Sequence, residues 1–123
     1  MNIDALIGKT LVSVTGEVGS DVIQFIDQSG KEYQMYHCQD CCESVTVEDI
    51  CGDLMDLIGS PILQASEESS NINPEGVNPE YRQDSFTWTF YRLATMKGSV
   101  VIRWYGESNG YYSEEVDFCE VPA

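Results

Sequence analysis

The chain has 123 residues and carries 21 acidic side chains against 6 lysines and arginines, which gives a formal net charge of −15. A chain of this length folds as one domain and buries a sufficient core without metals or disulfides. Its hydrophobic content of 42% and aromatic content of 11% exclude an acidic disordered tail. Six cations are too few for a basic face that binds phosphates, so we expect no direct binding to nucleic acid or to an anionic membrane surface.

The N-terminus and the cysteines indicate the compartment. Residues 1–4 lack a basic region followed by an apolar stretch, so no signal peptide is expected. No apolar run approaches the roughly 18 residues of a membrane span. An odd number of cysteines without a secretion signal favours a cytosolic protein with reduced thiols. We predict that most of these thiols are buried: Cys38, Cys41, Cys42, Cys51 and Cys119.

The first third of the chain is predicted to form an antiparallel meander. Three segments combine β-branched, aromatic and other apolar residues, namely 11–18, 22–26 and 32–37, and turns containing Gly19 and Gly30 separate them. Short strands joined by tight turns are typical of hairpins. Residues 44–47 and 62–65 are expected to add two further short strands.

A helix is predicted around residues 48–58. Four apolar residues recur at i, i+4, i+7 and i+8, which is the spacing of a helical stripe: Ile50, Leu54, Leu57 and Ile58. Gly59 and Pro61 follow, and they favour an end to the helix because glycine adopts the left-handed cap and proline cannot continue the helix. We expect the outer face of this helix to be acidic: Glu48, Asp49, Asp53 and Asp56.

Residues 66–84 form a polar segment with two Asn-Pro pairs. We expect a long surface loop here, and a loop of this length in a compact domain is typically functional or mobile. A binding element and a disordered insertion are both compatible with this composition.

The last third is the densest β region. Hydrophobic and aromatic residues alternate through 85–94 and 100–105, and a return strand is expected over 112–121. Asn109-Gly110 is the strongest hairpin signal in the chain, because both residue types tolerate positive φ. We therefore expect the strand that follows this turn to pair with the strand that precedes it.

Together these elements predict an α+β fold. The expected architecture is a twisted antiparallel β-sheet meander of about six to eight strands, with the helix around 48–58 packed on one face. The prediction for domain organisation is a single acidic domain over residues 1–123. The chain contains no internal repeat.

The acidic surface is the largest single feature of the sequence. Val116 and Phe118 are expected to face the core, which places Glu115 and Asp117 on the outer side, about 6.7 Å apart from the strand rise. Such a row can imitate a phosphate track and occupy a basic surface of a partner protein. The residues predicted to bind that partner are Glu67, Glu68, Glu107, Glu114, Glu115 and Asp117. Simple solvation of a small acidic domain is the alternative.

A second hypothesis concerns a small ligand. If Arg92 and Arg103 lie on neighbouring strands of one face, they can form a pocket for an anion or a nucleotide, with Tyr91 or Tyr105 stacking on the base. The alternative is that these arginines pair with the abundant carboxylates and pack over aromatic rings. We expect no resident cofactor.

A third hypothesis concerns the crowded segment 37–43. His37, Cys38 and Cys41 offer a possible set of metal ligands, but a zinc site needs a second pair of ligands at suitable spacing. A Cys/His nucleophile is disfavoured because the surrounding carboxylates raise a thiol pKa. The structural alternative is a turn in which Asp40 caps backbone donors. We therefore predict no metal site, no catalytic residue and no enzymatic activity.

Two blocks of the sequence resemble a family of small uncharacterised bacteriophage and prophage proteins. The first contains His-x-x-Asp-Cys-Cys-Glu at 37–43, and the second contains Arg-Trp-Tyr-Gly-x-Ser-Asn-Gly-Tyr-Tyr at 103–112. The resemblance implies a phage origin and a setting in the host cytoplasm. Small acidic phage proteins often inhibit host defence, as anti-CRISPR and anti-restriction proteins do. By this analogy we expect a non-catalytic inhibitor that binds a basic surface of a host defence protein, and a homo-oligomer is compatible with the sequence.

Overall fold

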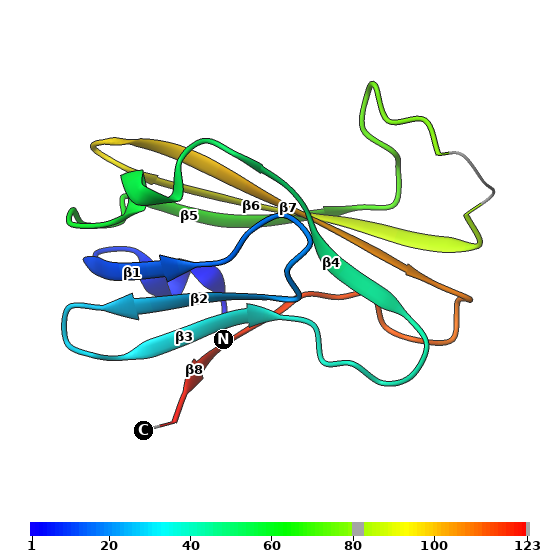
Figure 1. The fold of residues 1–123 in the computed structure, drawn as a ribbon, viewed down its shortest axis with the longest axis horizontal. Coiled ribbons are helices and arrows are strands. Elements are labelled where there is room, and N and C mark those ends of the chain that lie inside the picture. Colours follow the sequence, from blue (N-terminus) through cyan, green and yellow to red (C-terminus); the bar gives the residue numbers. More distant parts are fainter. Residues whose placement is uncertain (80–82, 123) are drawn as a thin grey trace.

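The computed structural model describes residues 1–79 and 83–122. Two four-stranded antiparallel sheets face each other as the layers of a β-sandwich (Figure 1). The strands are β1 (Leu11–Thr15), β2 (Val22–Asp27), β3 (Glu32–Tyr36), β4 (Ser44–Cys51), β5 (Gln64–Ser70), β6 (Ser85–Thr95), β7 (Gly98–Ser108) and β8 (Asp117–Val121). Two 3-10 turns, η1 (Ile3–Leu6) and η2 (Leu54–Leu57), precede β1 and follow β4. No helix in the described residues is long and apolar enough to cross a bilayer.

The predicted α+β class is wrong, because the described part of the chain contains no α-helix. The residues predicted as a helix form the end of β4 and the short turn η2. Ile50 pairs with Ile102 of β7, so the segment is held in a sheet. Gly52 ends the strand with φ of 108°, and a side chain there would place Cβ 2.6 Å from the carbonyl oxygen of Ser99. Tertiary pairing thus overrides the helical spacing.

The apolar stripe of this segment still faces the core. Asp53 caps η2 by accepting a hydrogen bond from the Met55 amide at 2.9 Å. Leu57 is fully buried, and Ile50 and Leu54 pack against the core. A strand end followed by one 3-10 turn therefore buries the same side chains that a helix would bury.

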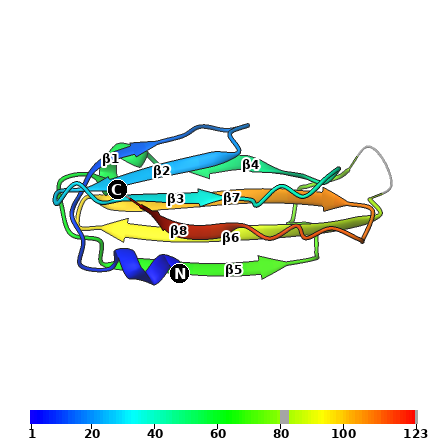
Figure 2. The ribbon, with the colours of Figure 1, turned by 90° about the horizontal axis from the view of Figure 1, so that it is seen from below.

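The strand order is β1-β2-β3-β8 in one sheet and β4-β7-β6-β5 in the other. The three strands predicted in the first third of the chain are confirmed as β1, β2 and β3. The expected final hairpin is wrong: β8 pairs with β3 and not with β7 (Figure 2). A turn does occur at Asn109-Gly110, where Gly110 has φ of 95°, but it sends the chain across to the opposite sheet.

Aromatic side chains fill the space between the sheets. Trp104 is fully buried, and its indole N–H donates to the sulfur of Met35 on the facing sheet at 3.1 Å. Phe118 of β8 stacks on Tyr33 with ring centroids 5.8 Å apart and meets Phe25 edge to face at 6.0 Å. These contacts hold β8 in the sheet that it joins after the crossing.

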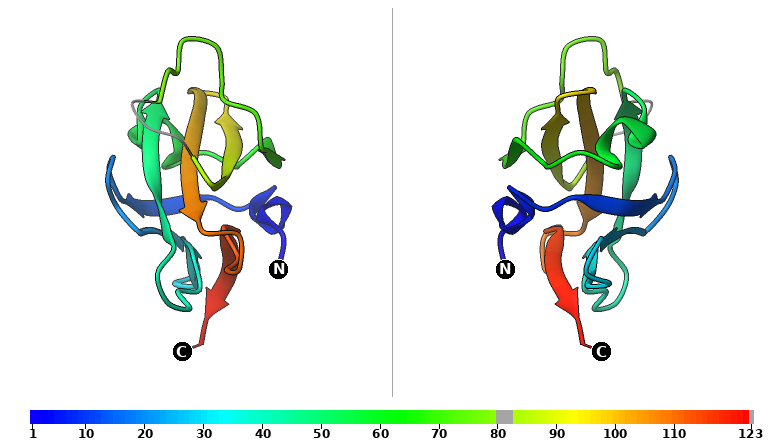
Figure 3. Two further views of the ribbon diagram at one scale, coloured as in Figure 1. Left: turned by 90° about the vertical axis from the view of Figure 1, so that its right-hand side faces the viewer. Right: turned by 90° about the vertical axis from the view of Figure 1, so that its left-hand side faces the viewer.

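The predicted loop over 66–84 is shorter than expected, because β5 extends to Ser70. Residues 71–79 and 83–84 lie on the outer side of the β4-β7-β6-β5 sheet (Figure 3), and residues 80–82 of the predicted loop lie outside the described residues. Asn73 accepts a hydrogen bond from the Trp88 indole at 3.1 Å, and Gln83 donates to the Tyr105 hydroxyl. Trp88 is therefore 2% exposed although its side chain is on the outer face.

Candidate functional site

A polar cleft opens at the edge of the sandwich between β5, β6 and the segment that leads into β8. Its volume is about 420 Å³. Two walls come from β5 and β6, and the third comes from the chain that crosses from β7. The lining residues are Glu67, Ser69, Thr87, Thr89, Glu115 and Val116. This cleft is the candidate site, and we call it the acidic cleft.

The register of β5 explains why Glu67 reaches the acidic cleft. Glu67 lies opposite Tyr91, and Ala65 lies opposite Leu93. Ala65, Tyr91 and Leu93 are buried in the core, so this face of β5 points between the sheets. At the end of the sandwich the same face becomes accessible, and Glu67 is exposed there.

Negative charges near the acidic cleft oppose the ionisation of Glu67. Burial raises the pKa of Glu67, and the negative charges of Glu115 and Asp117 raise it further. Burial likewise raises the pKa of Tyr91, and the charges of Glu67 and Asp117 add to that effect. Acidic groups from distant parts of the chain thus meet at one place, where a bound cation would relieve their repulsion.

The structure places the six predicted partner-binding residues in different surroundings. Glu67 and Glu115 line the acidic cleft, and Asp117 lies near enough for its charge to raise the pKa of Glu67. Glu68 is on the opposite face of β5, where it pairs with Arg92 at 3.0 Å. Glu107 is half-buried on the outer face of β7, opposite Phe86 of β6.

Glu114 is not part of an outward row, so that expectation is wrong. It is 8% exposed, and its carboxylate accepts hydrogen bonds from Thr87 at 2.8 Å and Ser108 at 2.5 Å. Its neighbour Glu115 is exposed, and Val116 is buried as predicted. Glu114 therefore anchors the crossing segment against β6 and β7.

The model of a domain of unknown function, DUF7448, matches residues 4–118. The chain belongs to the DUF7448 family. No curated protein and no solved structure matches the chain. The match to DUF7448 spans every residue of the acidic cleft, and the family is one of unknown function.

The predicted arginine pocket does not form as expected. Arg92 and Arg103 do lie on neighbouring strands of one outer face, but each already has an acidic partner: Arg92 pairs with Glu68, and Arg103 pairs with Glu48 at 2.5 Å. The guanidinium groups also lie over aromatic rings, Arg92 5.6 Å from the Phe90 centroid and Arg103 5.0 Å from Trp88. Paired charges leave little attraction for an anion.

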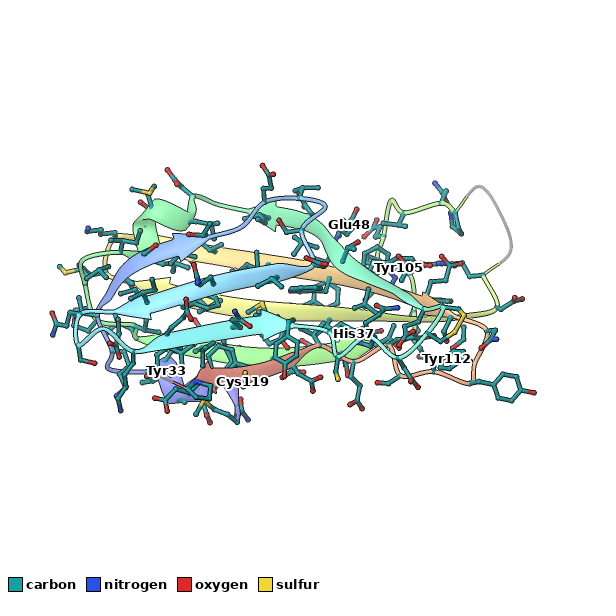
Figure 4. All side chains as sticks on the ribbon, turned by 60° about the horizontal axis from the view of Figure 1, so that its bottom comes forward. Tyr33, His37, Glu48, Tyr105, Tyr112 and Cys119 are labelled. Atoms are coloured by element: carbon teal, nitrogen blue, oxygen red, sulfur yellow. A yellow bond between two sulfur atoms is a disulfide. The ribbon has the colours of Figure 1, made fainter. Side chains whose placement is uncertain are left out.

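The two tyrosines of that hypothesis are also separated. Tyr91 is fully buried between the sheets and cannot stack on a ligand. Tyr105 is half-buried on the outer face, where it and Glu48 line a small pocket of about 170 Å³ beside Trp88 (Figure 4). The pocket has apolar walls and one carboxylate, which does not suit a phosphate group.

The predicted metal ligands are engaged elsewhere. The His37 ring is 3% exposed and lies at the end of β3 (Figure 4). Its Nε2 is 2.9 Å from Glu43, and its Nδ1 is 2.6 Å from the carbonyl oxygen of Glu115. Cys41 is joined to Cys42 by a disulfide, and Cys38 is free and exposed. Among residues 1–79 and 83–122, no group of three or more His, Cys, Asp and Glu side chains is placed to hold a metal ion.

Glu43 is the residue that sequence reasoning missed. Its buried carboxylate accepts hydrogen bonds from His37 and from the amides of Asp40 and Cys41. Burial opposes the ionisation of Glu43, but these hydrogen bonds outweigh burial and lower its pKa to about 2. Glu43 and His37 thus connect the cysteine turn to Glu115 at the acidic cleft. No spacing signal distinguishes Glu43 among 21 acidic residues.

The cysteine prediction is also corrected. Cys51, like Cys38, is exposed, and Cys119 is half-buried. Cys119 lies opposite Gln34 of β3 and forms a hydrogen bond that raises the pKa of Tyr36. None of the five cysteines belongs to the buried apolar core of the described residues.

Proposed function

We propose that this DUF7448 protein is a non-catalytic binding protein whose acidic cleft docks onto a basic surface of a partner protein. The observation that carries the proposal is that Glu67 and Glu115 line one cleft, where burial and then the negative charges of Glu115 and Asp117 raise the pKa of Glu67. A basic partner removes this repulsion on binding. The net charge of −15 also steers a cationic partner over long range.

We further propose that the partner is a host defence protein and that the chain acts as a phage-encoded inhibitor in the host cytoplasm. This step rests on the resemblance of the blocks at 37–43 and 103–112 to phage proteins, together with the charge. A stoichiometric inhibitor of the anti-CRISPR or anti-restriction type needs no catalytic group. It needs a negative surface that competes with nucleic acid for the same basic site.

The test is a charge reversal with a matched control. The double variant Glu115→Lys/Asp117→Lys is compared with Glu17→Lys/Asp21→Lys, which makes the same change in net charge at exposed positions before β2. The partner is first captured from lysate of a bacterium that carries defence systems, and its affinity is then measured with purified proteins at about 0.1 M salt.

We expect the cleft variant to bind the partner at least about tenfold more weakly, a loss of about 1.4 kcal/mol, and the control variant to lose far less. Unfolding curves check that both variants remain folded. Equal weakening by the two double variants contradicts a specific role for the acidic cleft, because the effect then follows net charge alone.

A further inference from the structure

A disulfide joins two neighbouring residues in the turn between β3 and β4, residues 37–43, which we call the cysteine turn. Cys41 and Cys42 are adjacent in the chain, and both are exposed (Figure 4). A disulfide stabilises a fold mainly by closing a loop of the unfolded chain, and this stabilisation grows with the length of the loop. A bond between neighbours closes almost no loop, so the stability of the sandwich does not explain it.

The exposure of this disulfide makes it accessible to thiol–disulfide exchange. Exchange requires that a thiolate reach one of the two sulfur atoms, and exposed disulfides are the labile ones. Disulfides in a reducing compartment, such as the host cytoplasm proposed above, are usually transient, catalytic or redox-sensing. The Cys41–Cys42 bond is therefore suited to a change of redox state in the folded protein.

One buried carboxylate organises the backbone around the disulfide. The amides of Asp40 and Cys41 donate to Glu43 at 3.0 and 2.8 Å, and the Gln39 side chain donates to the same carboxylate at 3.0 Å. The disulfide closes a small covalent ring that includes the peptide bond between Cys41 and Cys42. This ring restricts the backbone torsions on both sides of that peptide bond, and reduction frees them. Reduction therefore loosens the arrangement that directs these amides toward Glu43.

Glu43 connects the cysteine turn to the acidic cleft through His37. The His37 ring is 3% exposed, with Nε2 2.9 Å from the Glu43 carboxylate and Nδ1 2.6 Å from the carbonyl oxygen of Glu115. A carboxylate and a carbonyl oxygen both accept, so both ring nitrogens donate. Glu115 lines the acidic cleft. Direct contacts thus lead from the disulfide to one wall of the cleft.

We propose that Cys41 and Cys42 form a reversible redox site whose state sets the position of Glu115 in the acidic cleft. A dithiol reductant breaks the S–S bond: two electrons and two protons pass to the two sulfurs, and the reductant becomes a disulfide. A low-molecular-weight disulfide reverses the step by exchange and leaves as two thiols. The oxidised turn holds Glu115 through Glu43 and His37, and the reduced turn releases it. Only a consequence for partner binding rests on the proposed function.

Alkylation followed by mass spectrometry tests the redox site. The full chain is oxidised with oxidised dithiothreitol or reduced with dithiothreitol, unfolded in urea and treated with iodoacetamide. We expect three modified cysteines in the oxidised chain, which are the three free ones, and all five in the reduced chain. Cys42→Ser should abolish this difference, whereas Cys51→Ser, which removes an exposed free cysteine outside the turn, should keep it. Five modified cysteines in the oxidised chain, or a difference retained by Cys42→Ser, overturns the inference.

Amide signals of the 15N-labelled full chain test the link to Glu115. We expect the signals of residues 39–43 and 115–116 to shift with a single midpoint as the ratio of reduced to oxidised dithiothreitol is varied. In His37→Gln the signals of 39–43 should still respond, and those of 115–116 should not. If His37→Gln does not fold, Cys42→Ser replaces it, and its signals at 115–116 should match those of the reduced wild type in both states.

Signals of 115–116 that do not respond in the wild type, or that respond with a separate midpoint, overturn the link. Neither experiment uses a partner protein. Their failure therefore leaves the proposed function standing, and the comparison of Glu115→Lys/Asp117→Lys with its control tests that function separately.

Discussion

Truncation of Glu114 tests the structural role that separates it from Glu115. The Glu114 carboxylate is buried and accepts hydrogen bonds from Thr87 of β6 and Ser108 of β7. Its Cβ and carbonyl oxygen also lie against Gly106, where an added Cβ would approach both to 2.9 Å. Glu114→Ala removes the group that fastens the crossing segment, whereas Glu115→Ala removes an exposed charge.

The magnitude follows from the two hydrogen bonds. A hydrogen bond to a charged group contributes about 1.5–3 kcal/mol. Thr87 and Ser108 are half-buried, so water can solvate their hydroxyls after truncation, and we take a combined loss of about 2 kcal/mol in the free energy of unfolding. A domain of this size loses about 4 °C in Tm per kcal/mol, which gives a decrease of about 8 °C. Glu115→Ala is expected to change stability by less than about 0.5 kcal/mol.

Urea unfolding at neutral pH measures both variants, and Thr87→Val adds a third measurement. Thr87→Val removes one of the two hydroxyls and is expected to cost about 1 kcal/mol. In the double variant the two losses should not add, because Glu114 and Thr87 form one contact. If Glu114→Ala unfolds the chain, Glu114→Gln keeps an acceptor oxygen and gives a smaller, measurable loss. Equal stability of Glu114→Ala and Glu115→Ala would refute the reasoning.

Two further predictions concern the turns of the sandwich. Asp27 accepts hydrogen bonds from Ser29, and these lower its pKa below the ordinary value near 3.8. The ionised carboxylate therefore stabilises the fold fully above that ordinary value, and this stabilisation is lost as the pH falls through the lower pKa of the folded state. In urea unfolding, the stability difference between wild type and Asp27→Asn should shrink as the pH falls from about 6 to about 3. A stability difference that stays constant over this pH range would contradict a lowered pKa of Asp27. Gly52→Ala should cost about 1–3 kcal/mol because of the positive φ and the approach to Ser99, and more than Gly30→Ala, which has positive φ but open space.

Period-2 alternation predicted several strands well. In β6 and β7 every second residue is buried through most of the strand. A long stretch of such alternation predicts a β-strand from the sequence alone. Trp88 is the instructive exception, because it belongs to the outer set and is buried only by the loop that covers it. The sequence does not show which outer residues a loop will cover.

The helix prediction failed because its apolar spacing has two structural solutions. Residues at i, i+4 and i+7 share one side of a helix, and here they also share one side of a strand end joined to a 3-10 turn. The pairing of β4 with β7 decides between them: it runs along the whole of β4, with a register shift in β4 between Val47 and Asp49. A pairing partner that is about 50 residues away has no local signal.

The acidic cleft depends on the same crossing of the chain that the hairpin signal failed to predict. If β8 paired with β7, Glu115 and Asp117 would lie next to a strand that β6 and β4 already enclose on both sides. Because β8 joins β3 in the other sheet, the crossing segment packs against β6 and β7, and Glu115 comes to line the same cleft as Glu67. Composition was enough to predict an acidic surface. Which carboxylates share one site is decided by the topology, and the buried anchors Glu43 and Glu114 hold that segment in place.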